Sequence, residues 1–106
     1  MGVIDLSIII INYKTPNLVC DCLASIYKSK TKYNYEIIVL DNNSQDDSKK
    51  IITKKYSKIK FIAEQKNHGF AKGNNLAAKK ARGRYFLFLN SDTLVYKDTI
   101  QKAVAR

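Results

Sequence analysis

The sequence predicts an α/β fold in which a parallel sheet of four strands alternates with helices, in the strand order 3-2-1-4. Two observations predict it. Apolar runs of strand length recur along the chain, and each is followed by a segment with helical spacing or composition, as in right-handed βαβ units. Three of these runs also end abruptly on short polar residues, at the strand ends where such sheets bind ligands.

The first strand and helix are predicted from residues 6 onward. Residues 6–11 are almost all β-branched or aliphatic and lead into Asn12 and Tyr13. Thr15 then suits the N-cap of a helix, with Pro16 at its first position. The residues at the spacing of one helical face should pack on the sheet, and they are Leu18, Val19, Cys22, Leu23, Ile26 and Tyr27.

The second strand is predicted at residues 35–40 and stops on the polar residues 41–44, Asp-Asn-Asn-Ser. Ser44 and Asp47 have the spacing of a capping box, so we expect the next helix to begin there and to run through Tyr56. Its many lysines predict a solvated outer face.

The remaining elements follow the same alternation. Residues 59–63 predict a third strand, less apolar and therefore nearer the sheet edge. Residues 70–82 predict a helix that stops at Gly83 in a left-handed conformation. Residues 85–89, Tyr-Phe-Leu-Phe-Leu, predict a fourth strand buried on both faces, and a last helix follows Asp98.

The composition bounds the class of protein. With 106 residues, 45% hydrophobic content and one proline, residues 1–106 predict a single folded domain. A sheet ending at its fourth strand leaves one edge uncovered, so we expect a truncated domain that is open to self-association. Cys20 and Cys22 lie on different faces of the predicted helix, which favours reduced thiols and a cytoplasmic location. No apolar run reaches the length of a membrane span.

Three polar loops should meet at one edge of the sheet. A strand spacing of about 4.8 Å puts the ends of the second and fourth strands about 10 Å apart, which suits a nucleotide. Asp41 is placed to bind a base or ribose, and Asp92 to meet phosphates through Mg²⁺ or Mn²⁺. The alternative is purely local: turn and cap preferences explain residues 41–44 and 90–93 without any ligand.

Four blocks in order carry a family resemblance: residues 7–13 (Ser-Ile-Ile-Ile-Ile-Asn-Tyr), 41–44, 67–75 (Asn-His-Gly-Phe-Ala-Lys-Gly-Asn-Asn) and 88–92 (Phe-Leu-Asn-Ser-Asp). Together they resemble the amino-terminal half of a family 2 glycosyltransferase with the GT-A fold, most of all the rhamnosyltransferase-like branch. The resemblance implies the Rossmann-like, nucleotide-binding half of that fold.

The resemblance also implies roles for single residues. Asn12 and Tyr13 would line a base pocket, and Asp41 would bind the pyrimidine. The implied substrate-binding residues are Asn12, Tyr13, Asp41, Asn43, Asn67, Gly69, Asn75 and Asn90, and the implied metal ligand is Asp92. Two positions depart from the family pattern: Asn90 replaces the first acid of its D-x-D motif, and Asn74 stands where many relatives carry arginine.

The implied activity is transfer of a sugar, with inversion, from a UDP- or dTDP-sugar to a glycan or lipid-linked acceptor during cell-surface polysaccharide synthesis. The family's catalytic base lies in its later half, and nothing in these 106 residues matches it. We therefore expect this chain to bind the donor with Mg²⁺ or Mn²⁺ and not to transfer the sugar.

The net charge of +10 motivates two other readings. The first is a basic nucleic-acid-binding module, although the lysines are dispersed over several helices and no stacking motif occurs. The second is peripheral contact of the parent enzyme with anionic lipid at the inner face of the membrane. His68 is the only histidine, so it predicts a loop residue and not a zinc ligand.

Overall fold

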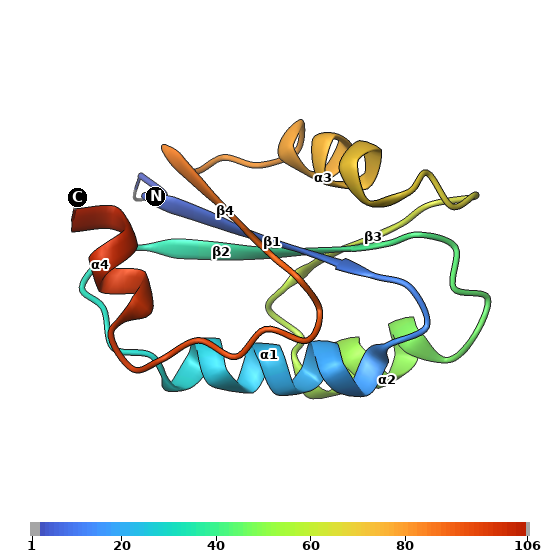
Figure 1. The fold of residues 1–106 in the computed structure, drawn as a ribbon, viewed down its shortest axis with the longest axis horizontal. Helices are drawn as coiled ribbons and strands as arrows, with labels where there is room; N and C mark the ends of the chain where they lie inside the picture. The colour runs from blue at the N-terminus through green and yellow to red at the C-terminus, as the bar shows by residue number, and fades with distance from the viewer. Residues whose placement is uncertain (1–2, 106) are drawn as a thin grey trace.

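The computed structural model describes residues 3–105 and contains four strands and four helices in strict alternation. Their bounds are β1 Leu6–Asn12, α1 Pro16–Lys28, β2 Tyr35–Asp41, α2 Ser48–Lys55, β3 Lys60–Ala63, α3 Phe70–Ala78, β4 Tyr85–Leu89 and α4 Thr99–Ala105. All strand pairs are parallel and the order is β3-β2-β1-β4, which confirms the predicted topology. Helices α1 and α2 lie on one side of the sheet and α3 on the other (Figure 1).

The core has two layers because β1 and β2 are apolar on both faces. Every residue of β1 is buried. On one side, Ile8 and Ile10 pack with the buried residues of α1 and with Ile100 of α4. On the other side, Ile9 and Ile11 pack with Ala77 of α3. Helices therefore cover both faces of the two central strands, as the uninterrupted aliphatic runs predicted.

Two polar pairs join β1 to β2 at positions that are direct neighbours in the parallel register. Near the start of the strands, the Ser7 hydroxyl donates to Glu36 Oε2 at 2.6 Å. At their end, Asn12 Nδ2 donates to Asp41 Oδ1 at 2.7 Å. Ser7 Oγ also accepts the Gly83 N–H at 2.8 Å, so the segment before β4 is tied to the same point.

The prediction that β4 is buried on both faces was wrong. Tyr85, Phe86 and Phe88 are 49%, 44% and 46% exposed. The reason is position: among residues 3–105, β4 pairs only with β1, at the edge of the sheet, and α3 covers only the neighbouring part of the sheet. An all-apolar run distinguishes a buried strand from a polar one, but it cannot tell whether the covering elements are present.

Two further expectations for the α3–β4 connection were wrong. The helix ends at Ala78, four residues earlier than predicted, and its C-cap Lys79 keeps right-handed backbone angles. Among the described glycines only Gly69 has a positive φ, so Gly83 is not a left-handed stop. Gly83 instead permits a close approach to β1, since an added Cβ would lie 2.5 Å from the Ser7 backbone nitrogen.

The helix starts agree in part with the sequence. Thr15 is the N-cap of α1 and Pro16 its first residue, as predicted, although the Thr15 hydroxyl bonds Asn12 Oδ1 at 3.3 Å and not the helix. The predicted capping box was wrong, because α2 begins only at Ser48 and the Ser44 hydroxyl bonds Asp41. The Ser44 hydroxyl therefore donates to the Asp41 carboxylate and does not cap the helix.

Most of the apolar stripe of α1 faces the core as predicted, and Cys20 and Cys22 are buried free thiols. Leu18 and Tyr27 are exceptions, each 43% exposed. Tyr27 stacks on Tyr56, with ring centroids 5.5 Å apart. Within the described range, none of the helices has both the length and the apolar character that a membrane crossing requires.

Candidate nucleotide-binding site

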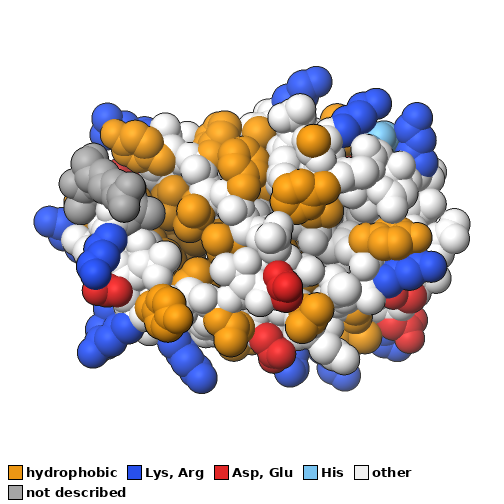
Figure 2. All heavy atoms as spheres, in the orientation of Figure 1, with side chains coloured by type: hydrophobic (Ala, Val, Ile, Leu, Met, Phe, Trp, Pro, Cys, Tyr) orange, Lys and Arg blue, Asp and Glu red, His pale blue; other side chains and the backbone are white. Residues whose placement is uncertain are grey.

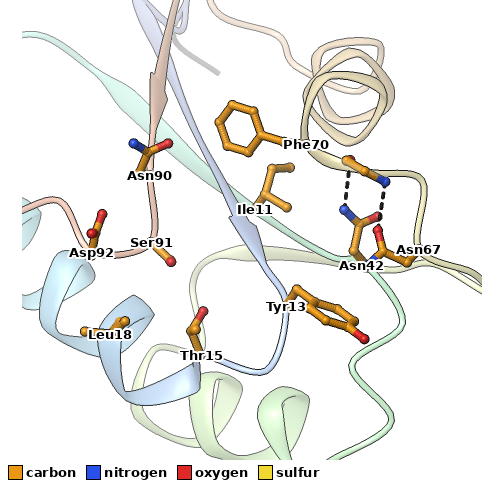
Figure 3. Close-up of a pocket in the computed structure, with 11 residues that line it drawn as sticks. Ile11, Tyr13, Thr15, Leu18, Asn42, Asn67, Phe70, Asn90, Ser91 and Asp92 are labelled. Atoms are coloured by element: carbon orange, nitrogen blue, oxygen red, sulfur yellow. Dashed lines mark hydrogen bonds between the residues drawn. The ribbon is translucent and has the colours of Figure 1, made fainter.

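A cavity of about 450 Å³ opens at the carboxyl ends of β1, β2 and β4 (Figure 3). Its walls come from four places: the β1–α1 connection, the end of β2, the loop that enters α3, and the loop that leaves β4. The lining residues are Ile11, Tyr13, Thr15, Leu18, Asn42, Asn67, Gly69, Phe70, Asn90, Ser91 and Asp92. The three polar loops of the sequence therefore contribute to one site, although not every predicted residue reaches it.

Asp41 lies outside the cavity lining, and its carboxylate accepts three hydrogen bonds from its neighbours. Its Oδ1 accepts from Asn12 Nδ2 at 2.7 Å and from the Ser44 hydroxyl at 2.6 Å. Its Oδ2 accepts the Ser44 N–H at 3.1 Å. Asp41, Asn12 and Ser44 are all buried, and none of them lines the cavity. The arrangement holds the ends of β1 and β2 together and supports the residues above it.

Two tight loops pass around this buried cluster. Lys14 and Asn43 have φ angles of 59° and 62°, in the left-handed region that asparagine tolerates and lysine adopts less readily. The Lys14 N–H donates to Ser44 Oγ at 2.8 Å, which holds the strained turn of the first loop. The Lys14 ammonium lies 5.3 Å from the ring centroid of Tyr13, a cavity-lining residue. Asn43 is half-buried and lies outside the lining.

Asn42 joins the end of β2 to the loop that enters α3. Its Nδ2 donates to the Gly69 carbonyl at 3.0 Å and its Oδ1 accepts the His68 N–H at 3.2 Å. The first of these bonds is visible in Figure 3. Gly73 lets α3 approach this side chain, because a Cβ there would lie 3.1 Å from Asn42 Nδ2. Asn42 is thus both a structural clamp and part of the cavity wall.

The sequence-based prediction named Asp41 as a substrate-binding residue and did not name Asn42, which lines the cavity. A signal was available: adjacent residues at a strand end point to opposite sides, so only one of the two could face the cavity. Phe70 was also missed, although a large aromatic residue directly after Gly69 is a visible feature. Its ring is 53% exposed and lies on the side of the cavity toward Asn90 (Figure 3).

The amino terminus of α3 opens onto the cavity. Gly69, its N-cap, has φ 81° and donates its N–H to Asn67 Oδ1 at 2.7 Å. No acidic residue occupies the first turn of α3, so the partial positive charge of its amide groups is not neutralised from within the helix. Asn75 is exposed outside the lining, and Asn74 is buried in α3.

The polar residues that follow β4 are more exposed than those that follow β2, which are largely buried and hydrogen-bonded. Asn90 and Asp92 are exposed, and no hydrogen bond or ion pair within residues 3–105 engages the Asp92 carboxylate. The negative charge of Asp92 affects the pKa of the Cys22 thiol in α1. Burial raises the pKa of the Cys22 thiol to about 11, with the negative charge of Asp92 as a smaller contribution.

The predicted metal ligand fits a nucleotide-bound cation. No cluster of three or more His, Cys, Asp or Glu side chains occurs in the part of the chain that the structure describes. Mg²⁺ beside a nucleotide typically takes one or two carboxylates, and water and phosphate oxygens complete its shell. Asp92 supplies one free carboxylate on the cavity wall, which Asn90 and Ser91 also line.

A parallel 3-2-1-4 sheet with helices on both faces and a polar cavity at its carboxyl edge is the Rossmann-like architecture of the GT-A fold. The family can be given more narrowly. The chain belongs to glycosyl transferase family 2, whose model matches residues 7–106. The predicted family is therefore confirmed, and its rhamnosyltransferase-like branch stays a prediction.

Relatives and solved structures agree with this assignment. The chain is 39% identical over 98 residues to an uncharacterized glycosyltransferase of Rickettsia conorii, covering 91% of this chain and 16% of that protein. It is 30% identical over 103 residues to the poly(ribitol-phosphate) beta-N-acetylglucosaminyltransferase TarS of Staphylococcus aureus, covering 93% of this chain and 18% of TarS. The chain thus spans less than one fifth of these relatives.

The crystal structure of S. aureus TarS 1-349 in complex with UDP matches with a TM-score of 0.85 at 30% identity, over 96% of this chain and 31% of that one. The mannosyltransferase PcManGT of Pyrobaculum calidifontis, in complex with GDP-Man and Mn2+, matches with a TM-score of 0.81 at 23% identity, over 93% and 31% of the two chains. At that identity the second match shows the shared fold alone.

Proposed function

We propose that this chain binds the nucleotide-diphosphate part of a UDP- or dTDP-sugar in the cavity at the carboxyl edge of the sheet. The observation that carries the proposal is the asymmetry of the cavity wall. Amide and aromatic side chains stand on one side, at Tyr13, Asn42 and Asn67, and a free carboxylate stands on the other, at Asp92. A nucleotide sugar has the matching asymmetry, with a flat base at one end and a charged diphosphate at the other.

The amide and aromatic side would take the base. The Tyr13 ring offers a stacking surface, while the Asn42 and Asn67 amides can both donate and accept, as a pyrimidine edge requires. We assign direct contact to Asn42 and a supporting role to Asp41 and Asn12, because Asn42 lines the cavity and those two do not. The UDP and UDP-GlcNAc complexes of TarS support a uridine donor.

The carboxylate side would take the diphosphate. Asp92, assisted by the oxygens of Asn90 and Ser91, would hold Mg²⁺ or Mn²⁺, and the metal would neutralise charge on the phosphates. The amide groups at the start of α3 add a second source of positive potential at Gly69 and Phe70. The assignments of Asn43 and Asn75 rest on resemblance only, since both stand outside the lining.

Family 2 glycosyltransferases are enzymes, and we propose that the parent protein transfers the sugar with inversion to a glycan or lipid-linked acceptor. Names of relatives support a polymeric or lipid-linked acceptor, among them poly(ribitol-phosphate) for TarS and diphosphoundecaprenol for a glucosyltransferase of Escherichia coli. We assign no general base within residues 1–106, so donor binding without transfer is the expected behaviour of this chain.

Calorimetric titration of the chain with UDP, UDP-GlcNAc and a dTDP-sugar, with and without Mn²⁺, tests the proposal. We expect saturable heat that depends on Mn²⁺, and a Kd that rises roughly tenfold or more in Asp92→Asn. The matched control is Asp98→Asn, which removes an exposed carboxylate of the Lys102 ion pair outside the cavity. No heat at about millimolar ligand would overturn donor binding. Tight, salt-sensitive gel shifts with oligonucleotides would then favour the nucleic-acid alternative.

A further inference from the structure

The loop between β3 and α3, residues 64–69, carries part of the cavity wall. Asn67 and Gly69 line the cavity, and His68 lies between them in the chain. Residues 65–67 are exposed, whereas His68 is half-buried. A ligand that binds to an exposed loop must pay for ordering it, unless contacts within the protein already hold the loop in its bound shape. The contacts of His68 are therefore relevant to binding in this cavity.

Backbone contacts fasten both ends of this loop to the end of β2, which lies across β1 from the β4 edge. The Glu64 N–H donates to the Asp41 carbonyl at 2.9 Å. The His68 N–H donates to Asn42 Oδ1 at 3.2 Å, and Asn42 Nδ2 donates to the Gly69 carbonyl at 3.0 Å. These contacts leave the middle of the loop to be fixed by side chains.

One side-chain hydrogen bond closes the loop across its base. His68 Nε2 and Glu64 Oε1 lie 2.8 Å apart. An ionised carboxylate can only accept, so the hydrogen is assigned to Nε2. Only 11% of the His68 side chain and 25% of the Glu64 side chain are exposed, so water competes poorly for this bond. His68 Nδ1 is buried without a partner among the described residues, which leaves Glu64 as the group that orients the ring.

The same bond bears on the direction of Asn67. Asn67 directly precedes His68, and its Oδ1 accepts the Gly69 N–H at 2.7 Å (Figure 3). Asn67 is therefore joined to His68 through its backbone and to the residue beyond His68 through its side chain. A change in the His68 backbone angles would move the Asn67 amide within the cavity wall. The Glu64 bond resists that change and so acts on a side chain that it does not touch.

We propose that Glu64 and His68 are positioning residues for nucleotide binding, which hold the loop in the shape that presents the Asn67 amide to the base. This inference rests on the proposed function, since it needs a nucleotide in the cavity. Neither Glu64 nor His68 lines the cavity, so both act through Asn67 and not by contact with the ligand. When the bond is broken, a smaller fraction of the chain holds the competent loop, and the apparent Kd rises in proportion.

Calorimetric titration with UDP and Mn²⁺ tests the pair. Glu64→Ala removes the acceptor and should raise the Kd about fivefold, the change that corresponds to one hydrogen bond of ordinary net strength. Glu64→Gln keeps an acceptor for His68 Nε2, so its Kd should stay within about twofold of the wild-type value. The matched control is Gln65→Ala, at an exposed position of the same loop outside the lining, which should leave the Kd unchanged.

The charge of Glu64 does not explain the expected loss. Figure 2 shows Lys and Arg side chains around much of the rim of the molecule, in keeping with its net charge of +10. Glu64→Ala makes the chain still more positive, and on charge alone it should bind the anionic UDP more tightly. Glu64→Gln changes the charge by the same amount. A weaker affinity in Glu64→Ala alone therefore indicates a lost position and not a lost charge.

A double-variant cycle separates positioning from a general effect on stability. If Glu64 acts through Asn67, then Glu64→Ala should add nothing to the loss of affinity in Asn67→Ala. A purely structural role would multiply the two losses. Amide hydrogen exchange of the chain without ligand gives a second readout. In Glu64→Ala, exchange should accelerate at the hydrogen-bonded His68 and Gly69 amides and stay unchanged in the strands.

A failure of this inference is distinguishable from a failure of the proposed function. A wild-type chain that gives no heat with UDP at about millimolar concentration overturns the proposed function, and the positioning role with it. Wild-type binding that Glu64→Ala leaves unchanged, or losses that multiply in the double variant, overturn the positioning role alone. A Glu64→Gln variant that binds as weakly as Glu64→Ala overturns the hydrogen bond as its cause.

Discussion

The polar loops that follow β2 and β4 resemble each other in sequence, but their aspartates lie in different environments. The β2 exit places Asp41 at 8% exposure, where neighbouring groups supply three hydrogen bonds to its carboxylate. The β4 exit leaves Asp92 exposed, and no partner within the described residues engages its side chain. Both carboxylates follow apolar strands and neighbour the same cavity. The difference teaches that similar sequences can leave one carboxylate buried among hydrogen-bond donors and the other exposed, and under the proposed function the first supports the site and the second meets the ligand.

The largest expected effect follows from removing each carboxylate in turn. Asp41→Ala leaves the buried Asn12 amide and the Ser44 hydroxyl without their acceptor, so the free energy of unfolding should fall by about 3 kcal/mol. Asp92→Ala removes no protein contact and should change it by less than about 0.5 kcal/mol. Urea denaturation followed by circular dichroism measures both. Equal losses of stability in the two variants would contradict the proposed difference between the two carboxylates.

The next largest effect is a pH dependence of stability that comes from the Cys22 thiol. Burial first, and Asp92 second, raise the pKa of the Cys22 thiol from its ordinary 9.0 to about 11. Between those pH values the unfolded chain loses this proton and the folded chain keeps it, so stability falls as pH rises. The loss should reach about 2–3 kcal/mol by pH 11. It is absent below pH 9.

Urea denaturation at several pH values measures this slope. Because Cys20, Tyr27 and Tyr35 also have raised pKa values, the informative quantity is the difference between wild type and Cys22→Ala. The variant should show a flatter decline above pH 9. Asp92→Asn should reduce the decline only slightly, since burial is the larger cause. Parallel curves for wild type and Cys22→Ala would rule out this account.

The smallest expected effect tests the link between the β2 exit and α3. Asn42→Ala removes the hydrogen bonds to His68 and Gly69 and should lower the free energy of unfolding by about 1–2 kcal/mol. Faster amide exchange should be confined to the His68 and Gly69 region, because the core contacts of α3 remain. Exchange that accelerates uniformly over the sheet would show that Asn42 is not a local clamp.

Much of this architecture was predictable from the sequence, because strand and helix signals agree along most of the chain. Strand positions came within one residue, and the order of the strands was correct. The exposure of β4 was not predictable, since its residues are those of a buried strand and only the arrangement of neighbours reveals the edge. The capping prediction was wrong because the Ser44 hydroxyl bonds the Asp41 carboxylate and not the backbone of the next helix.

The site was predictable at the level of loops and less so at the level of single side chains. The three polar exits do meet at one edge, and Tyr13, Asn67, Gly69, Asn90 and Asp92 do line the cavity. The sequence could not decide between Asp41 and Asn42, because adjacent polar residues look equivalent until the backbone direction is fixed. Both side chains are buried, and they differ in that Asn42 lines the cavity and Asp41 does not.

The two polar pairs between β1 and β2 bear on how the chain selects its alignment. Both strands are aliphatic on both faces, so a shifted pairing would bury nearly as much apolar surface as the native one. Ser7–Glu36 and Asn12–Asp41 are satisfied together only at zero shift, since both are direct partners in the same register. Any slip leaves carboxylates facing aliphatic neighbours, at a cost in free energy. Polar residues thus act as alignment marks for an otherwise degenerate pair of strands.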